Sequence, residues 1–342
     1  MRGSTSRPRR AGVRTRLVLA ALVVLVGAGL TAGLASSTTS ASKMIVLIPK
    51  QTGDPFFADA RAGAQQAAKQ LGYTINYVGP ATADASGQVS TIQNVIQLHP
   101  VAITISADDP NAVAPALKRA AKQGILVTAF NADVAKDARK FFINQASDQG
   151  IAEAVADTMA AQVKNQGHFL LITSTATAPN QNLWNALIKK YIAKKYPKMK
   201  IDTIIPGNDD PATVLTVTSS YLAAHKSTTT GIIVTGGGMS GAVKAEQRNG
   251  ISPKKVPVAG LCIPSDVKAM IHAGLIKNCV LWSPADTAYA NVYAIDAYLK
   301  HKYEPNGTIK TGKLGTLKVT NNVVQVGKPV VFTIKNIDQF HF

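Results

Sequence analysis

Residues 44–72 read MIVLIPKQTGDPFFADARAGAQQAAKQLG, and this stretch decides the fold class. The apolar run 44–48 predicts a buried strand, because it is short and rich in branched side chains. Asp54 and Pro55 then supply an N-cap and a proline at the first helical position. Gly72 fits the left-handed residue that ends such a helix. One strand, one loop and one amphipathic helix therefore make a β-α unit.

The same unit recurs along the chain. Strand-like runs at 73–79, 101–107 and 125–131 alternate with helical stretches at 86–99 and 108–124. Successive β-α units form a parallel sheet that helices cover on both faces. The pattern restarts at EAVADTMAAQVKNQG and continues to NCVLWS, which predicts a second unit of similar size.

The expected fold class is α/β, with two doubly wound parallel-sheet lobes and a ligand cleft between them. We expect the first lobe to contain residues 43–146 and about 285–303. We expect the second lobe to contain residues 147–284 and about 304–342, including a C-terminal antiparallel ribbon. Ligands of such folds bind outside the carboxyl ends of the strands, so candidate residues are sought there.

The first 42 residues have the layout of a secretory signal peptide. Six arginines and no acid occupy residues 1–16, an apolar run follows from 17 to about 35, and the tail SSTTSAS leads to Lys43. We expect export to the periplasm or the cell surface, with cleavage near residues 41–43. The alternative is an uncleaved signal anchor that tethers the protein, since about 19 apolar residues just span a bilayer.

The 342-residue chain has 37 Lys and Arg against 19 Asp and Glu, a formal net charge of +18. Without the six leader arginines, 31 basic residues remain against 19 acidic ones, which leaves +12. The basic stretches lack interleaved aromatics and a recognition motif, so we expect no nucleic-acid partner. The charge excess is instead interpreted as a solvated helix surface.

Residues 236–241, GGGMSG, match a glycine-rich phosphate-binding pattern. A dinucleotide site would also need an acidic residue about 20 positions on, where Cys262 and Ile263 stand. A serine nucleophile at Ser240 would need a glycine two positions later, where alanine stands. A dinucleotide-dependent or serine-based enzyme is therefore the less favoured alternative, and we expect a non-catalytic protein without a cofactor.

We expect no metal site either, because the two cysteines stand far apart and the histidines are scattered. Two Asp-Asp pairs, 108–109 and 209–210, each precede a proline. Because Asp before Pro is typical of a helix start, both pairs are interpreted as helix caps rather than as paired catalytic carboxylates.

Five further stretches follow in order along the chain: GQVSTIQNVIQ, PALKRAAKQGILVTAFNAD, FFINQ, NQNLW and VVFTIKNIDQFHF. Together with Ile-Pro-Lys at 48–50, they resemble the sugar-binding proteins of bacterial ABC importers, the ribose- and galactose-binding class that shares its fold with lac-repressor-type cores. The similarity is greatest to the branch of the autoinducer-2 (AI-2)-binding and rhamnose-binding proteins. It covers residues 44–342 and implies the type I periplasmic binding protein fold.

The resemblance implies ligand contacts in the first lobe. Lys50 would donate to a ligand oxygen, and Phe56 and Phe57 would face the cleft, where sugar C–H groups pack on aromatic rings. Asn131 stands where the branch has an aspartate that binds ligand hydroxyls. Asp133 matches a second aspartate of the same motif.

The resemblance also implies contacts in the second lobe. Asn180 and Gln181 match an Asp-Gln pair, and a loop contact falls at Thr235, Gly236 and Gly237. An amide both donates and accepts, with less charge-assisted strength than a carboxylate. The two Asp-to-Asn departures and the triple glycine imply a roomier, less anionic pocket that suits a neutral sugar or polyol.

The resemblance implies a further pocket residue at Trp282, with Trp184 supporting the pocket loop, and Cys262, at a strand end, is expected near the cleft. An offset of four or five residues between neighbouring parallel strands would place Cys262 roughly 15 Å from Cys279. A disulfide needs Cα atoms within about 7 Å, so we expect free thiols.

The resemblance implies a sugar-like small-molecule ligand and an ABC permease in the membrane as partners, and we expect a monomer. Ligand binding would close the two lobes about a hinge. The alternative of the same fold is a receptor for AI-2 or another signal molecule.

Overall fold

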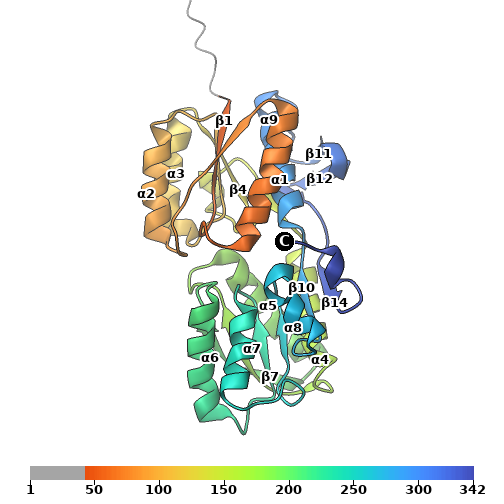
Figure 1. The fold of residues 1–342 in the computed structure, drawn as a ribbon. Coiled ribbons are helices and arrows are strands. Elements are labelled where there is room, and N and C mark those ends of the chain that lie inside the picture. The colour runs from red at the N-terminus through yellow and green to blue at the C-terminus, as the bar shows by residue number, and fades with distance from the viewer. Residues whose placement is uncertain (1–42) are drawn as a thin grey trace, which may run out of the picture. The chain divides into compact units, whose positions relative to one another are not determined.

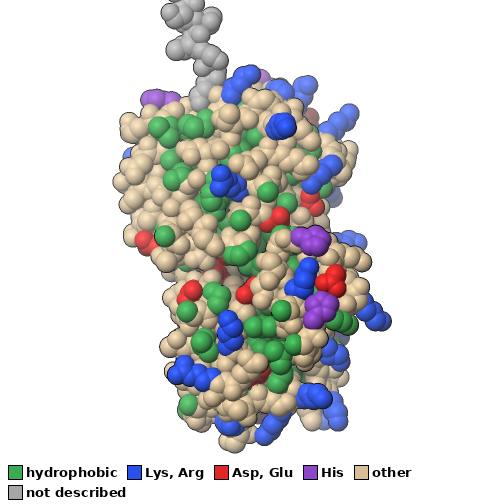
Figure 2. All heavy atoms as spheres, viewed as in Figure 1, with side chains coloured by type: hydrophobic (Ala, Val, Ile, Leu, Met, Phe, Trp, Pro, Cys, Tyr) green, Lys and Arg blue, Asp and Glu red, His purple; other side chains and the backbone are tan. Residues whose placement is uncertain are grey.

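The computed structural model describes residues 43–342, so the predicted leader and its cleavage lie outside the described residues. Figure 1 shows two groups of strands and helices, each built on its own sheet, which we call the first and the second lobe. Among residues 43–342, no helix combines the length and the apolar character that a membrane crossing requires. Figure 2 shows Lys and Arg side chains dispersed over the visible face of both lobes rather than gathered into one patch.

The first lobe is built on an eight-stranded sheet in the order β11-β12-β13-β5-β4-β3-β1-β2. The neighbouring strands from β2 through β1, β3, β4 and β5 to β13 are parallel, whereas β12 pairs antiparallel with β13 on one side and with β11 on the other. The strands are β1 (Met44–Ile48), β2 (Thr74–Tyr77), β3 (Ala102–Ile105), β4 (Leu126–Phe130), β5 (Phe142–Asn144), β11 (Gly307–Lys310), β12 (Thr316–Thr320) and β13 (Val323–Gln325).

Helices cover both faces of this sheet, as the repeated β-α units predict. Alternate residues of β1 point to opposite faces: Ile45 and Leu47 join the core shared with α1, and Val46 and Ile48 join the core beneath α2 and α3. Helices α1 and α9 lie side by side on one face, and α2 and α3 lie on the other (Figure 1). Their bounds are α1 (Pro55–Leu71), α2 (Ala85–Ile96), α3 (Pro110–Lys122) and α9 (Pro284–Leu299), with short 3-10 turns at η1 (Lys136–Ala138) and η2 (Gly312–Leu314).

The first helix begins and ends where the sequence predicts. The Asp54 carboxylate accepts a hydrogen bond of 2.8 Å from the Phe56 backbone N–H, and Pro55 follows it at the first helical position. Gly72 ends the helix in the left-handed conformation, with φ of 79°. The capping signals therefore determine how the chain leaves β1 and turns back onto the sheet.

The second lobe contains a four-stranded parallel sheet in the order β7-β6-β8-β9 and an antiparallel pair, β10 and β14. Helices α4 and α5 pack against each other, as do α6 and α7. The strands are β6 (Gln166–Thr173), β7 (Lys198–Pro206), β8 (Gly231–Val234), β9 (Val258–Gly260), β10 (Asn278–Leu281) and β14 (Val330–Thr333). The helices are α4 (Asp148–Ala160), α5 (Pro179–Lys195), α6 (Pro211–His225), α7 (Met239–Arg248) and α8 (Pro264–His272), with a 3-10 turn at η3 (Ile337–Gln339).

The C-terminal ribbon corrects the expected division of the chain. The sequence assigned residues 304–342 to the second lobe, but β11, β12 and β13 extend the first sheet through the parallel pairing of β13 with β5. Only β14 and the residues after it join the second lobe. The outer edge of β5 needs a partner for its backbone groups, and the ribbon provides it. The chain therefore passes between the lobes three times, after β5, after β10 and after β13.

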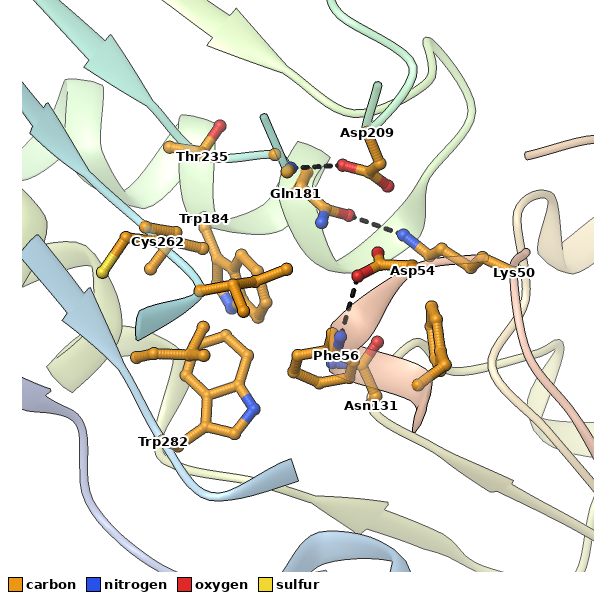
Figure 3. Close-up of a pocket in the computed structure, with 16 residues that line it drawn as sticks. Lys50, Asp54, Phe56, Asn131, Gln181, Trp184, Asp209, Thr235, Cys262 and Trp282 are labelled. Atoms are coloured by element: carbon orange, nitrogen blue, oxygen red, sulfur yellow. Dashed lines mark hydrogen bonds between the residues drawn. The ribbon is translucent and has the colours of Figure 1, made fainter. Parts of the chain in front are cut away.

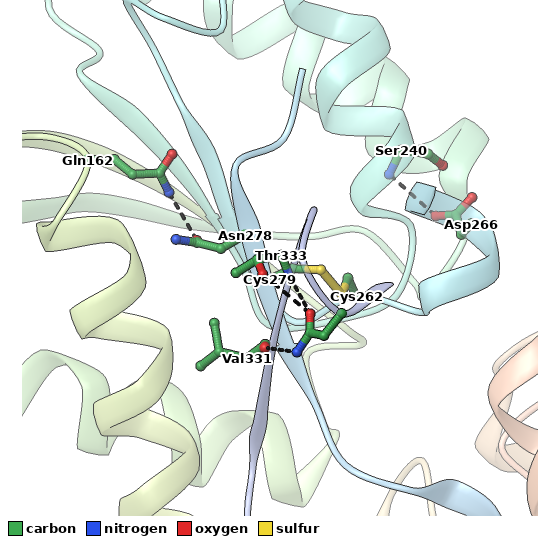
Figure 4. The surroundings of a disulfide bond; sticks show 9 residues. Gln162, Ser240, Cys262, Asp266, Asn278, Cys279, Val331 and Thr333 are labelled. Carbon is green, nitrogen blue, oxygen red and sulfur yellow. Dashed lines mark hydrogen bonds between the residues drawn. A yellow bond between two sulfur atoms is a disulfide. The ribbon is translucent and has the colours of Figure 1, made fainter. Parts of the chain in front are cut away.

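The expectation of free thiols is wrong, because Cys262 and Cys279 form a disulfide with a Cα–Cα distance of 5.7 Å (Figure 4). The two strands are neighbours and parallel, as predicted, but their register differs from the assumed one. Leu261 lies opposite Val280, and the Cys262 N–H donates to the Val280 carbonyl at 3.1 Å. The cysteines lie one residue after and one residue before this pair, within bonding reach.

We predict that the denatured, unreduced protein contains no titratable thiol and that reduction exposes two. Replacing both cysteines by serine should lower the free energy of unfolding by about 2–4 kcal/mol, because the cross-link closes a loop in the unfolded chain. Denaturant unfolding of both proteins measures this difference. Thiol reactivity before reduction would contradict the pairing.

The carboxylate of Glu246, on α7, is buried without a partner for its charge. Its side chain is fully buried, and neither carboxylate oxygen has a hydrogen-bond partner among the described residues. Burial raises the pKa of Glu246 from an ordinary value of 4.5 to about 8. The folded protein therefore holds one more proton than the unfolded chain between these two pH values.

Because the folded state binds the extra proton, the free energy of unfolding should fall as pH rises from about 4.5 to about 8. Glu246→Gln keeps the side chain neutral, so it should weaken this pH dependence and stabilise the protein at pH 8 by on the order of 2 kcal/mol. Urea unfolding at pH 5, 6.5 and 8 measures the effect. Glu304→Gln, at an exposed position, is the matched control, and identical pH slopes in all three proteins would contradict the assignment.

Candidate functional site

A cavity lies between the two lobes, at the carboxyl ends of strands from both sheets (Figure 3). Asn131, Thr235 and Trp282 each directly follow a strand, namely β4, β8 and β10. This is the position in which parallel α/β sheets hold ligands. The lining residues are Lys50, Asp54, Phe56, Phe57, Asn131, Gln181, Trp184, Asp209, Thr235, Gly236, Gly237, Leu261, Cys262, Ile263, Leu281 and Trp282.

Lys50 joins the two lobes across this cavity. Its side chain is only 2% exposed, and its Nζ donates to Gln181 Oε1 at 3.0 Å and to Asn180 Oδ1 at 3.3 Å. Lys50 follows β1 of the first lobe, whereas both acceptors lie in the first turn of α5 in the second lobe. A buried ammonium group has three donors, so this arrangement leaves one N–H for a further acceptor.

Asn131 is held in the left-handed conformation, with φ of 61°, which asparagine tolerates better than most residues. Its side-chain oxygen accepts a hydrogen bond of 2.9 Å from the Ser106 hydroxyl. The polar atom of this side chain that remains for the cavity is therefore its amide nitrogen, a donor.

Aromatic and aliphatic side chains form one wall of the cavity (Figure 3). The Trp282 ring lies edge-on to Trp184 at 5.3 Å and to Phe56 at 6.2 Å between ring centroids. The Trp184 indole N–H donates to Asp148 at 2.7 Å, whereas the Trp282 indole N–H has no partner among the described residues. Trp184 thus lines the cavity as well as supporting it.

Two carboxylates, Asp54 and Asp209, also line the cavity, and sequence reasoning missed both as site residues. Burial and the charge of Asp209 raise the pKa of Asp54 to about 6. Asp209 accepts from the Gly237 N–H at 2.6 Å and from the Ser174 hydroxyl. The sequence marked Asp54 only as a helix cap, and nothing in it indicated the second role.

Asp54 and Asp209 thus add two carboxylates to the predicted lining, and the triple glycine adds no open space at Gly236. A Cβ built on Gly236 would lie 2.8 Å from the Ser174 backbone nitrogen and from an Asp209 carboxylate oxygen. The space that a side chain would occupy is filled by Asp209 and by the backbone after β6. The glycines are needed for this close approach.

The structure places most of the predicted site residues together. Lys50, Phe56, Phe57, Asn131, Gln181, Thr235, Gly236, Gly237, Cys262 and Trp282 line the cavity. Asn180 lies beside it as a partner of Lys50, and the Thr235 hydroxyl is engaged with Asn185 at 2.7 Å.

Asp133 has to be removed from the set, because it does not line the cavity. Its carboxylate forms a two-pronged ion pair with Arg139, including a bond of 2.6 Å from Nη2. A carboxylate engaged by a guanidinium in this way has few lone pairs left for a ligand.

The enzyme alternative rests on residues 236–241, in which Ser240 is the candidate nucleophile. Ser240 is buried in α7, and its backbone N–H donates to Asp266 at 3.4 Å (Figure 4). Within residues 43–342 no group of three His, Cys, Asp or Glu side chains is arranged to hold a metal ion. The glycines instead form the turn that Asp209 packs against.

Comparison with known proteins agrees with this geometry. A family model described as "Periplasmic binding protein domain" matches residues 45–303. The chain belongs to the periplasmic binding protein family. The match spans both lobes and the chain passages that follow β5 and β10.

Three solved structures illustrate the similarity within the periplasmic binding protein family. A sugar ABC transporter protein from Actinomyces odontolyticus is 32% identical, with a TM-score of 0.70, over 87% of this chain and 97% of that chain. LsrB from Clostridium saccharobutylicum, in complex with AI-2, is 26% identical with a TM-score of 0.83, over 87% of this chain and 100% of that chain. A solute-binding protein from Clostridium phytofermentas with bound L-rhamnose is 26% identical with a TM-score of 0.82, over 87% and 98%.

We predict that Gly236→Ala destabilises this periplasmic binding protein by about 1–3 kcal/mol, because the added methyl group meets backbone atoms that cannot move freely. Gly53→Ala is the matched control, since a Cβ there has no neighbour within 4 Å. Denaturant unfolding of the two variants measures the difference. Equal free energies of unfolding in the two variants would show that the turn accommodates the added methyl group.

Proposed function

We propose that the protein is the extracytoplasmic solute-binding component of an ABC importer and that it binds a monosaccharide or a similar polyhydroxylated molecule. The observation that carries this proposal is the cavity between the lobes, in which an aromatic wall faces a set of hydrogen-bonding side chains. A sugar ring offers apolar C–H faces to such a wall and hydroxyl groups to the polar side.

The relatives support a sugar as the class of ligand. Three of them, each 26% identical to this chain, are structures with AI-2, L-rhamnose and D-arabinose bound. These molecules differ from one another, so the relatives support the class and not one compound. We propose a neutral sugar, because donors from Lys50, Asn131 and Gln181 coexist in the cavity with the acceptor Asp54.

We propose that binding closes the two lobes and that the closed form docks on a membrane permease. Hydrogen bonds already cross between the lobes from Lys50 to Gln181 and from the Gln51 side chain to the Asp209 carbonyl at 3.1 Å. A ligand that bridges both lobes would shift the population towards this arrangement. The three chain passages between the lobes would serve as the hinge.

We propose an exported, monomeric, non-catalytic protein. The Cys262–Cys279 disulfide supports a location outside the cytoplasm, because such bonds persist in oxidising compartments. The N-terminal sequence pattern points the same way.

A second candidate is a receptor for AI-2 as a signal. The complex of the similar LsrB protein with AI-2 favours it, whereas the replacement of two expected aspartates by Asn131 and Asn180 weighs against it. AI-2 is therefore one arm of the test below.

Intrinsic fluorescence offers a direct measurement, because the only two tryptophans of the chain, Trp184 and Trp282, both line the cavity. We predict that at least one pentose, 6-deoxyhexose, hexose or polyol changes this emission with a micromolar or tighter dissociation constant, about −8 kcal/mol of binding free energy. Calorimetry with the same panel and with AI-2 identifies the tightest ligand.

Lys50→Met and Gln181→Ala should then weaken binding by roughly tenfold or more, since each removes a buried hydrogen-bonding group. Gln149→Ala, at an exposed position early in α4, is the matched control and should bind normally. If no member of the panel binds the folded protein, the proposed function is overturned. Unchanged affinity in both cavity variants would overturn the assignment of the site.

A further inference from the structure

The apolar wall of the cavity comes largely from two separate segments of the second lobe. Leu261, Cys262 and Ile263 follow β9, whereas Leu281 and Trp282 lie at the end of β10. All five residues line the cavity. The shape of the wall therefore depends on how β10 is placed beside β9.

Strands β9 and β10 belong to different sheets. Among residues 43–342, β9 is the last strand of the sheet β7-β6-β8-β9, whereas β10 pairs with β14 in a sheet of two strands. In this part of the chain β9 and β10 are joined by one isolated bridge, in which Leu261 lies opposite Val280 and the Cys262 N–H donates to the Val280 carbonyl at 3.1 Å. A two-stranded sheet is only marginally stable by itself, so the β10–β14 pair needs a further attachment to the larger sheet.

Helix α4 and the disulfide provide this attachment in different ways. Helix α4 packs against both strands and keeps them buried, but apolar packing is non-directional and does not fix the offset between the strands. The Cys262–Cys279 disulfide joins two defined atoms, with a Cα–Cα distance of 5.7 Å (Figure 4). Because a disulfide keeps its Cα atoms within about 7 Å, it limits how far β10 can move along β9.

The disulfide lies behind the apolar wall. Cys262 belongs to the lining of the cavity, but Figure 3 shows its sulfur turned away from Trp184. Cys279 is fully buried, does not line the cavity and precedes Trp282 by three residues. The disulfide would therefore act on a ligand through the residues that it holds in place.

Trp282 is the wall residue whose contacts reach furthest from β10. Its ring lies edge-on to Trp184 of the second lobe, at 5.3 Å, and to Phe56 of the first lobe, at 6.2 Å, between ring centroids. A movement of β10 by one residue along its axis is about 3.3 Å, so it would change both contacts. The apolar surface that the cavity offers to a sugar therefore depends on the position of β10.

We propose that the Cys262–Cys279 disulfide is a positioning element of the ligand site, because it fixes β10 beside β9 and with it the place of Trp282 in the apolar wall. This inference rests on the proposed function and deepens it. Reduction by a dithiol such as dithiothreitol passes two electrons and two protons to the pair: the S–S bond breaks, two thiols form, and the dithiol becomes its cyclic disulfide. The oxidised protein is then the form with high affinity for the sugar.

Thermodynamic linkage makes this coupling reciprocal. If the disulfide strengthens sugar binding by a given factor, a bound sugar makes the disulfide harder to reduce by the same factor. Coupling between two sites of a protein is typically about 5- to 150-fold, and a tenfold change corresponds to about 30 mV in the potential of a two-electron couple. Sugar affinity and reduction potential therefore report on the same coupling.

The test compares the wild type with Cys262→Ser/Cys279→Ser and with Leu222→Ala as the matched control. Leu222 is buried on α6 and does not line the cavity, and loss of a buried leucine side chain lowers stability about as much as loss of a disulfide. Every buffer contains trimethylamine N-oxide, which favours the folded state without adding a sugar, and circular dichroism verifies folding. Calorimetry measures the affinity of each protein for the tightest neutral sugar of the panel.

The double variant should bind this sugar roughly 5- to 100-fold more weakly than the wild type, because β10 is no longer fixed beside β9. Leu222→Ala should bind like the wild type, since lost stability does not change the affinity of a protein that remains folded. If the serine pair does not fold, Cys262→Ala/Cys279→Val replaces it, with apolar side chains at both buried positions.

The second measurement uses the wild type in dithiothreitol buffers of graded potential, with free thiols counted by alkylation. A saturating concentration of the sugar should lower the reduction potential of the disulfide by about 30 mV for each tenfold of coupling. Circular dichroism of the reduced protein verifies that the shift is measured on a folded chain.

Unchanged affinity in the folded double variant, or a reduction potential that the sugar does not move, would overturn the inference and leave the proposed function intact. Equal weakening of binding in Leu222→Ala would overturn it as well, because the effect would then follow from lost stability. A wild type that binds no sugar of the panel would instead overturn the proposed function, and the role of the disulfide in binding with it.

Discussion

The ammonium group of Lys50 sits between the lobes with only neutral oxygens, those of Asn180 and Gln181, as its direct partners. Taking such a charge out of water is costly unless it is hydrogen-bonded and its field is balanced. No carboxylate of the described residues lies within ion-pair distance of it, but Asp54 and Asp108 lie close enough to interact with its charge. The polar half of the cavity is arranged around this one cation.

Aspartate before proline serves two purposes in this chain. At Asp54 the same carboxylate caps α1 and lines the cavity, whereas at residues 209–210 the two tasks are divided: Asp209 lines the cavity and Asp210 caps α6. Helices of parallel α/β folds begin where the strands end, so a capping residue is necessarily close to the ligand edge of the sheet. A second carboxylate beside the cap therefore reaches the lobe boundary at little structural cost.

Local signals were sufficient to predict the β-α units, whereas most of the cavity residues were predicted from the resemblance to sugar-binding proteins. Asp54-Pro55 and Gly72 mark the ends of α1, and residues at strand ends, such as Lys50 and Asn131, converge because parallel strands end at one edge. The two wrong predictions, the free thiols and the lobe assignment of the C-terminal ribbon, depended on pairing between strands that are distant in the sequence. The register at Leu261 and Val280 brings the cysteines together, and the ribbon completes the first sheet at β5. Neither the register of these strands nor the pairing of the ribbon with β5 can be predicted from the local sequence pattern.

The side chains that line the cavity are distributed over both lobes, so neither lobe alone offers a sugar both the polar groups and the apolar wall. The first lobe supplies Lys50, Asp54 and Phe56, and the second supplies Gln181 and most of the apolar wall. Trp282 belongs to that wall and also begins the passage from β10 to α9, one of the three connections between the lobes. A ligand that packs on Trp282 therefore contacts the connection directly. In the proposed function, binding and closure would therefore share this residue, and a sugar that fills the cavity would also restrict the relative motion of the lobes.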